Sequence, residues 1–242
     1  MFDLSWILAV AVIILASSLQ AMTGFGFAIL AVPMLLLVFD AKTAVGLSMI
    51  VSFFSVTTLS IKVHKSIIGH IVINLLIGAL FGIPFGVYIF FNFNVKTMKI
   101  LISCIVIILS IFLISGYRFK IKNSSWVERI VGSISGLMTA SIGMPGPPIV
   151  LFLNNRQLPK DKFRATFACY NALVYVPSIL FLFFLGAINK IIILKALTLV
   201  PFAILGGILG NNIFPLVSQA HFQKGVPLLV LITALYSVLT VI

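Results

Sequence analysis

Two short glycine-rich segments carry the residues best suited to bind a small anion. They span residues 20–27 and 141–148, and the second contains the run Pro-Gly-Pro-Pro, through which no α-helix can continue. A helix that starts after such a break points unpaired N–H groups and the positive end of its dipole at the break. Two facing helix starts would hold an anion without any charged side chain. The candidate binding residues at the breaks are Thr23, Gly24, Phe25, Gly26, Ser141, Gly143, Met144 and Gly146.

Polar residues near the breaks extend this candidate site. Arg164 opens an apolar run, and its planar guanidinium is suited to hold an oxyanion, although it is also one more positive residue beside two lysines. Tyr170 and Asn171 follow one to two turns later, and Gln20 lies near the first break. Each is suited either to a ligand or to hydrogen bonds between helices. The glycines at the breaks also have a purely structural interpretation, because glycine allows close packing of helices or a kink.

No group of residues in the sequence indicates an enzyme. Catalysis would need a carboxylate pair, a metal cluster or a nucleophile with its base, and the apolar runs contain none of these. The three histidines lack the spacing of metal ligands. The sequence therefore predicts no catalytic residue, no metal and no cofactor.

Long apolar runs are the elements that must position the candidate site. Of 242 residues, 62% are hydrophobic and 8% are charged, whereas soluble domains carry about 25% charged residues. A helix needs about 20 apolar residues to cross a bilayer. The strand-like alternation of apolar and polar residues that is typical of a membrane barrel is absent. The sequence predicts an all-α polytopic protein in the lipid bilayer, with uncharged runs over residues 4–39, 43–61, 66–95, 100–117, 130–155, 165–189, 196–223 and 225–242.

The net charge of +12 follows from basic residues at the ends of these runs. That placement is typical of orientation by the positive-inside rule. Nucleic-acid binding is not expected, because no connection is long enough to form a soluble domain.

An internal duplication relates the two breaks. Sliding the chain by 121 positions places Asp40 on Asp161, and sliding it by 124 places Gly82 and Gly86 on Gly206 and Gly210. We expect one membrane domain over residues 1–242, with a first repeat over 1–118 and a second over 124–242. Asp40 and Asp161 are interpreted as N-caps of the helices that follow them.

The distribution of Lys and Arg favours re-entrant hairpins at the breaks. A straight helix over residues 4–39 would be about 54 Å long, against a hydrocarbon core of about 30 Å. If both broken segments return to their own face, the basic residues divide eleven to five, whereas single crossings divide them evenly. The predicted fold is two inverted repeats, each with a broken or re-entrant helix hairpin at the midplane followed by three transmembrane helices. In this topology the protein spans the cytoplasmic (inner) membrane, and both termini lie on its outer side.

Two segments resemble signatures of the TauE/SafE permeases. Residues 23–27 with Pro33 are similar to the first signature, and residues 143–148 followed by residues 158–166 are similar to the second. Met144 and Pro145 interrupt the run of glycines that family members often carry there. The resemblance covers essentially the whole chain. It implies transport of sulfite, sulfonates or related small sulfur oxyanions.

The leading functional hypothesis is therefore a permease that exports a small anion, most simply sulfite or a small organosulfonate. The expected partners are this small anionic substrate and the bilayer, and a homo-oligomer stays open. A membrane subunit or assembly factor without transport activity is the first alternative. An integral-membrane enzyme is the least favoured one.

Overall fold

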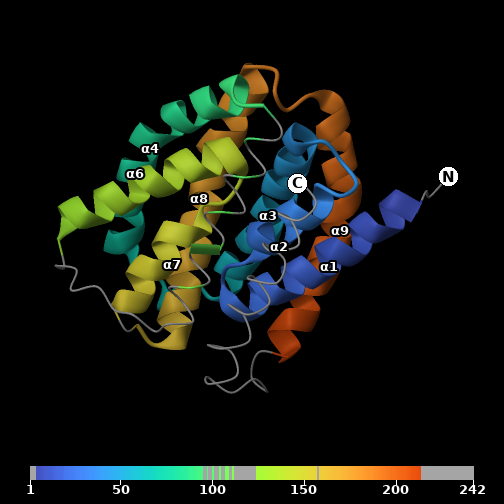
Figure 1. Cartoon of the computed structure of the whole chain (residues 1–242). Coiled ribbons are helices and arrows are strands. Elements are labelled where there is room, and N and C mark those ends of the chain that lie inside the picture. The colour runs from blue at the N-terminus through green and yellow to red at the C-terminus, as the bar shows by residue number, and fades with distance from the viewer. Residues whose placement is uncertain are drawn as a thin grey trace.

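A computed structural model describes residues 4–94, 97, 100, 104, 107, 108, 111, 124–156 and 158–213, with the side chains of Leu4, Ser5 and Thr23 left aside (Figure 1). These residues form α-helices and no strand, as the composition predicts. The predicted spans over residues 100–117 and 225–242 lie outside the described segments, apart from single positions in the first. The helices are α1 (Leu4–Thr23), α2 (Phe27–Leu35), α3 (Ala41–Lys62), the 3₁₀ turn η1 (His64–Ser66), α4 (Gly69–Asn92), α6 (Ser125–Ile142), α7 (Gly146–Asn155), α8 (Lys160–Phe184) and α9 (Lys190–Ile213).

Four of the described helices, α3, α4, α8 and α9, are long and apolar enough to cross a membrane. With 24 residues, α4 is about 36 Å long. Large apolar side chains on its outer surface are exposed, such as Phe81 at 71%, and α9 exposes Ile191 and Leu194 in the same way. Such a surface is costly in water and suited to lipid. The prediction of an integral membrane protein is confirmed.

Both predicted helix breaks are present. α1 ends at Thr23 and α2 begins at Phe27, with Gly24 and Gly26 at φ values of 80° and 99°. α6 ends at Ile142 and α7 begins at Gly146, with Gly143 at a φ of 72°. A side chain disfavours these left-handed conformations, which is why glycine occupies them. After each break the short helix packs against the long one before it, α2 on α1 and α7 on α6.

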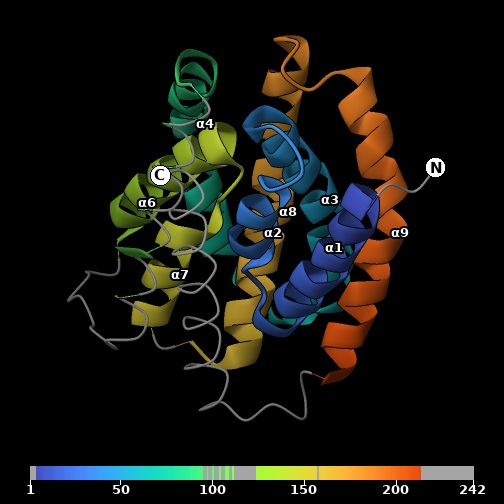
Figure 2. The same cartoon turned by 45° about the vertical axis from the view of Figure 1, so that its right-hand side comes forward.

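Glycine-mediated contacts hold each long broken helix against a helix of the other half (Figure 2). On α4, Cβ atoms at Gly82 and Gly86 would collide with the carbonyls of Ser133 and Leu137 on α6. On α9, Cβ atoms at Gly206 and Gly210 would collide with the carbonyls of Ile14 and Ser18 on α1. Small residues at four-residue spacing permit such close approach of membrane helices. The contacted residues are equally spaced along the chain, because Ile14 and Ser133 are 119 positions apart, as are Ser18 and Leu137.

The helix bundle has one strongly basic end. α8 starts at this end. Arg164 in its first turns donates to Asn211 in the last turn of α9. The start of α4 lies at the same end, because the backbone N–H of Ile68 donates to the Thr166 hydroxyl at 3.1 Å. α3 starts at the opposite end, where Lys195 lies over the Phe39 ring. We call these the basic end and the opposite end. The described basic residues at the basic end are Lys62, Lys65, Arg129, Arg156, Lys160, Lys162 and Arg164, and those at the opposite end are Lys42, Lys190 and Lys195.

A buried ion pair joins the start of α6 to the end of α7. Arg156, just after α7, lies 2.8 Å from Glu128 in the first turn of α6. Asn74 of α4 donates to the same carboxylate at 2.7 Å. The sequence predicts an apolar run from residue 130, which leaves Glu128 outside it. In the structure α6 begins at Ser125, and Glu128 is buried in its first turn. The pair keeps both ends of the α6–α7 segment at the basic end.

The interpretation of the two aspartates as N-caps is right for one of them. Asp40 caps α3 and accepts from the Thr43 N–H at 3.1 Å. Partial burial opposes its ionisation, but hydrogen bonds from Thr43 and from nearby backbone outweigh this, so the pKa of Asp40 lies below its usual value. α8 has Pro159 as its N-cap, and Asp161 lies in its first turn. The N-cap of α8 therefore lies two residues before Asp161.

Replacing Arg156 with methionine should destabilise the protein, because it leaves the Glu128 carboxylate buried without its ion-pair partner. We expect a loss of about 3 kcal/mol in unfolding free energy, measured by thermal or denaturant unfolding in detergent. Glu128→Gln combined with Arg156→Met removes both charges and should recover part of the loss. Lys162→Met, at an exposed position of the same end, serves as the control. Equal stability of Arg156→Met and Lys162→Met would show that the pair does not hold α6 to α7.

Candidate functional site

The first break packs directly against α8. A Cβ atom added to Gly24 would lie 2.9 Å from Arg164 Cα and 3.1 Å from the Arg164 carbonyl oxygen. The Gly24 N–H donates to the Gln20 carbonyl at 2.7 Å and so caps the end of α1. The first turn within α2 closes at Leu30, whose N–H donates to the Gly26 carbonyl. The N–H groups of Phe27, Ala28 and Ile29 therefore precede the helical hydrogen bonds of α2 and point into the break.

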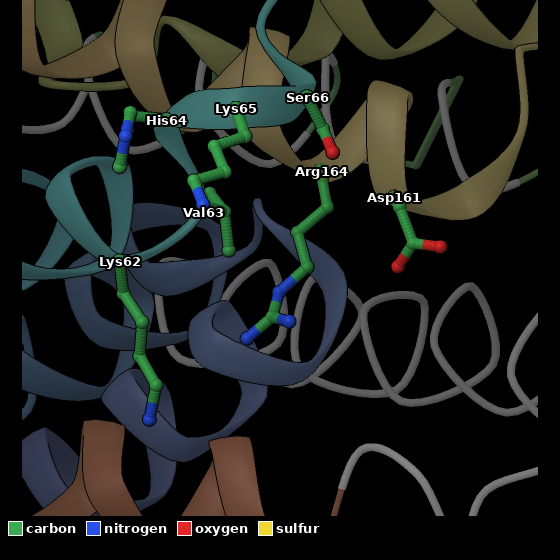
Figure 3. Close-up of a pocket in the computed structure, with 7 residues that line it drawn as sticks. All are labelled: Lys62, Val63, His64, Lys65, Ser66, Asp161 and Arg164. Atoms are coloured by element: carbon green, nitrogen blue, oxygen red, sulfur yellow. The ribbon is translucent and has the colours of Figure 1, made fainter.

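Arg164 is buried, in contrast to its neighbours. Its exposed fraction is 5%, whereas Lys160 and Lys162 are exposed. Its Nη2 donates to Asn211 Oδ1 on α9 at 2.8 Å, and its backbone contacts Gly24, so Arg164 lies at the junction of α8, α9 and the first break. Figure 3 shows the extended Arg164 side chain. The alternative of one more surface cation does not fit this environment.

The second break is poorer in available donors than the first. The N–H groups of Gly143 and Met144 donate back to α6 at 2.9 and 3.3 Å. In the first turn of α7, Pro147 and Pro148 have no N–H, which leaves that of Gly146. The two helix starts therefore differ, because the sequence of α7 supplies fewer donors than that of α2.

Aromatic rings link the two breaks along α8. The Phe25 ring lies edge-on to Phe163 and Phe167, with centroids 6.1 and 5.8 Å away. A Cβ atom on Gly146 would lie 3.4 Å from Phe167 Cζ and 3.9 Å from Ile29 Cδ1 of α2. The structure therefore brings Gly24, Phe25, Gly146 and Arg164 to one face of α8, with Phe167 between the breaks.

A chain of polar groups crosses the interior between α1, α3 and α8. Gln20 Nε2 donates to the Ser52 hydroxyl at 3.1 Å, and the Tyr175 hydroxyl lies beside Ser52. Tyr175 also donates to the Gly143 carbonyl at 3.3 Å, so the chain runs from the end of α1 to the second break. On the far side of α8, Tyr170 lies near Ser135, which donates to the Pro145 carbonyl at 2.6 Å.

Several buried side chains on α1, α3 and α8 have a polar atom with no hydrogen-bond partner among the described residues. They are Gln20 Oε1, Ser48 Oγ, Tyr170 OH and Asn171 Oδ1. All four side chains are at most 3% exposed. Buried polar atoms in native proteins are satisfied by protein, water or ligand, so these atoms are available to hydrogen-bond a small polar molecule.

The other predicted residues at the breaks offer less to a ligand in this structure. The Ser141 hydroxyl donates to the Leu137 carbonyl of its own helix at 2.7 Å, and Met144 is fully buried. The Thr23 side chain lies outside the described residues. Sequence reasoning missed Asn211 and Ser52. Asn211 offered a signal, as a polar residue within the apolar run 196–223.

Comparison with known protein families identifies a family that matches this chain. A sequence model of the family described as sulfite exporter TauE/SafE matches residues 9–237, nearly the whole chain. No curated protein and no solved structure matches the chain.

Alanine at Gly24 and at Gly186 should separate backbone strain from contact with α8. Both glycines have positive φ, 80° and 76°, but only Gly24 has atoms within 4 Å of the new Cβ. We expect Gly186→Ala to cost about 1 kcal/mol from the left-handed conformation, and Gly24→Ala to cost clearly more because Arg164 must move. Thermal unfolding in detergent measures the difference. Equal losses would contradict the close contact between the first break and α8.

Proposed function

The chain belongs to the sulfite exporter TauE/SafE family, a family of membrane transporters rather than enzymes, and we propose that it exports sulfite or a small organosulfonate across the cytoplasmic membrane. The observation that carries the proposal is the buried Arg164 packed against the Gly24 break. A cation and a helix start meet there, at the end of a polar chain that leads into the bundle.

We propose the following roles at this site. The N–H groups of Phe27, Ala28 and Ile29 and the Arg164 guanidinium attract the oxyanion, because helix starts and arginine both favour negative charge. Gly24 and Gly26 keep side chains out of the space before α2. Gln20, Tyr170 and Asn171 offer polar atoms deeper in the bundle. Gly146 contributes one N–H from the second break.

The fold of this transporter is proposed to be two inverted repeats. The contacts support this. The contact of α1 with α9 has a counterpart in that of α6 with α4, and the contact of α3 with α9 has one in that of α8 with α4. Gly24 packs on Arg164 and Gly143 packs on Val45, and both pairs are related by 119 positions. α3 and α8 occupy equivalent places and start at opposite ends of the bundle, as inversion requires.

The basic end is proposed to face the cytoplasm. The positive-inside rule favours this orientation, and the Glu128–Arg156 pair supports a second segment that returns to its own face. The parallel packing of α1 on α9 places the first turn of α1 at the opposite end, which supports an external N-terminus. The substrate then enters from the end where Arg164 lies.

Membrane potential is proposed to drive export. The four acidic residues of the chain are Asp3, Asp40, Glu128 and Asp161. Asp40 and Asp161 lie at helix starts, and Glu128 is paired with Arg156, so no carboxylate offers a proton relay through the described interior. An interior-negative potential favours expulsion of each negative charge by about 2.3 kcal/mol per 100 mV.

Radiolabelled sulfite flux in proteoliposomes under an imposed potential tests this function. We expect saturable flux that grows with the potential and is inhibited by one of sulfate, taurine or sulfoacetate. Arg164→Gln should reduce kcat/KM by at least about tenfold, because a charged hydrogen bond contributes about 1.5–3 kcal/mol. Lys162→Gln, which removes an exposed charge two residues away, should change it less than twofold.

Flux that ignores the potential and follows a proton gradient would contradict potential-driven export. Absence of flux for every sulfur oxyanion would contradict the substrate class and favour a subunit without transport activity of its own.

A further inference from the structure

A cavity of about 360 Å³ opens at the basic end, between the end of α3 and the start of α8 (Figure 3). This volume lies at the small end of the range for ligand sites, about 300–1,000 Å³. It is separate from the glycine segments that the sequence singled out. Its lining residues are Lys62, Val63, His64, Lys65, Ser66, Asp161 and Arg164.

The lining of this cavity is suited to a small anion. Lys62, Lys65 and Arg164 bring three positive charges, against the single negative charge of Asp161. Ser66 adds a hydroxyl. The His64 ring is held by its Nδ1, 2.8 Å from the Ile61 carbonyl. Convergent positive charge in a concave site raises the local concentration of anions.

Arg164 connects the cavity to the first break. Its side chain lines the cavity, and its backbone is the surface on which Gly24 packs. Asn211 holds the guanidinium in this position. An anion that leaves the cavity therefore meets the residue that borders the helix start of α2.

We propose that this cavity is the cytoplasmic loading site, where a small sulfur oxyanion binds to Lys62, Lys65 and Arg164 before it moves to the first break. The proposal rests on the proposed export function and adds to it a binding step and two residues, Lys62 and Lys65. Loading raises the occupancy of the deeper site, so it governs KM more than kcat.

The phosphate of an anionic lipid headgroup has the same charge and acceptor oxygens. The lining argues for a free anion, because Val63 is the one apolar residue among the seven and offers no groove for an acyl chain. The experiment must still separate the two sources.

Alkylation of a cysteine placed in the cavity tests the loading site directly. Ser66→Cys is made with Cys104 and Cys169, both free thiols, changed to serine. Its rate with anionic iodoacetate is divided by its rate with neutral iodoacetamide, and the ratio is normalised to that of a free thiol at the same pH. The ratio cancels thiol ionisation and reports local charge. Sulfoacetate serves as the competing anion, because sulfite itself would consume the reagents.

We expect iodoacetate to be favoured about tenfold at this cysteine, sulfoacetate to slow the reaction, and Lys62→Ala with Lys65→Ala to bring the normalised ratio close to one. Lys190→Ala with Lys195→Ala removes the same charge at the opposite end and should leave the ratio unchanged. His64→Cys repeats the test if Ser66→Cys does not fold. A ratio near one in the parent protein would overturn the proposal. The proposal would also be overturned if phosphatidylglycerol, added to neutral-detergent micelles, protected the cysteine from alkylation and sulfoacetate did not.

Transport by the same variants distinguishes this inference from the proposed function. Lys62→Ala with Lys65→Ala should raise the KM for sulfite about three- to tenfold, change kcat less than twofold, and make KM less sensitive to ionic strength. If the parent protein transports sulfite but sulfoacetate does not protect the cysteine, the loading site is overturned and the export function stands. Protection without any flux would support anion binding in the cavity and contradict the export function.

Discussion

Backbone N–H and C=O groups cannot be left unpaired where water is excluded, and the rest of this structure depends on how that constraint is met at the two buried breaks. At the first break, the Gly24 N–H caps α1 and the first turn of α2 begins with donors that no helical carbonyl can accept from. Such groups are stable only beside protein, water or a ligand. The proposed function assigns the ligand role to an oxyanion, which takes those N–H donors as its binding groups.

The two breaks meet this constraint differently, which makes the site asymmetric. α7 begins with Gly146, Pro147 and Pro148, so prolines remove donors that would otherwise need partners. Opposite Gly143, α3 presents the apolar Val45, whereas Gly24 faces Arg164. The proposed duplication therefore supplies two similar backbones, and the side chains concentrate positive charge at one of them. A single charged position near the basic end is consistent with an anion that binds before it crosses.

The sequence predicted the four described membrane-crossing helices and the position of both breaks, because each depends on local residue type or short spacing. It singled out Gly82, Gly86, Gly206 and Gly210 as matching positions, but not the helices that they contact. It missed Glu128 as a buried acid, since its ion pair with Arg156 forms only when α7 returns to the start of α6. The binding of Arg164 to Asn211 joins residues 47 positions apart and depends on how α8 and α9 pack. The number of N–H donors at each break depends on the positions of the prolines, and the sequence analysis used these prolines to place the break but did not count the donors that they remove.

The most direct test of anion binding at the first break is amide NMR of ¹⁵N-labelled protein titrated with sulfite in lipid or detergent. We expect saturable shifts at Phe27, Ala28 and Ile29 together with the Arg164 side chain, and a smaller shift at Gly146. Shifts confined to α7, or none at either break in protein that transports sulfite, would contradict a binding site formed by Arg164 and the start of α2.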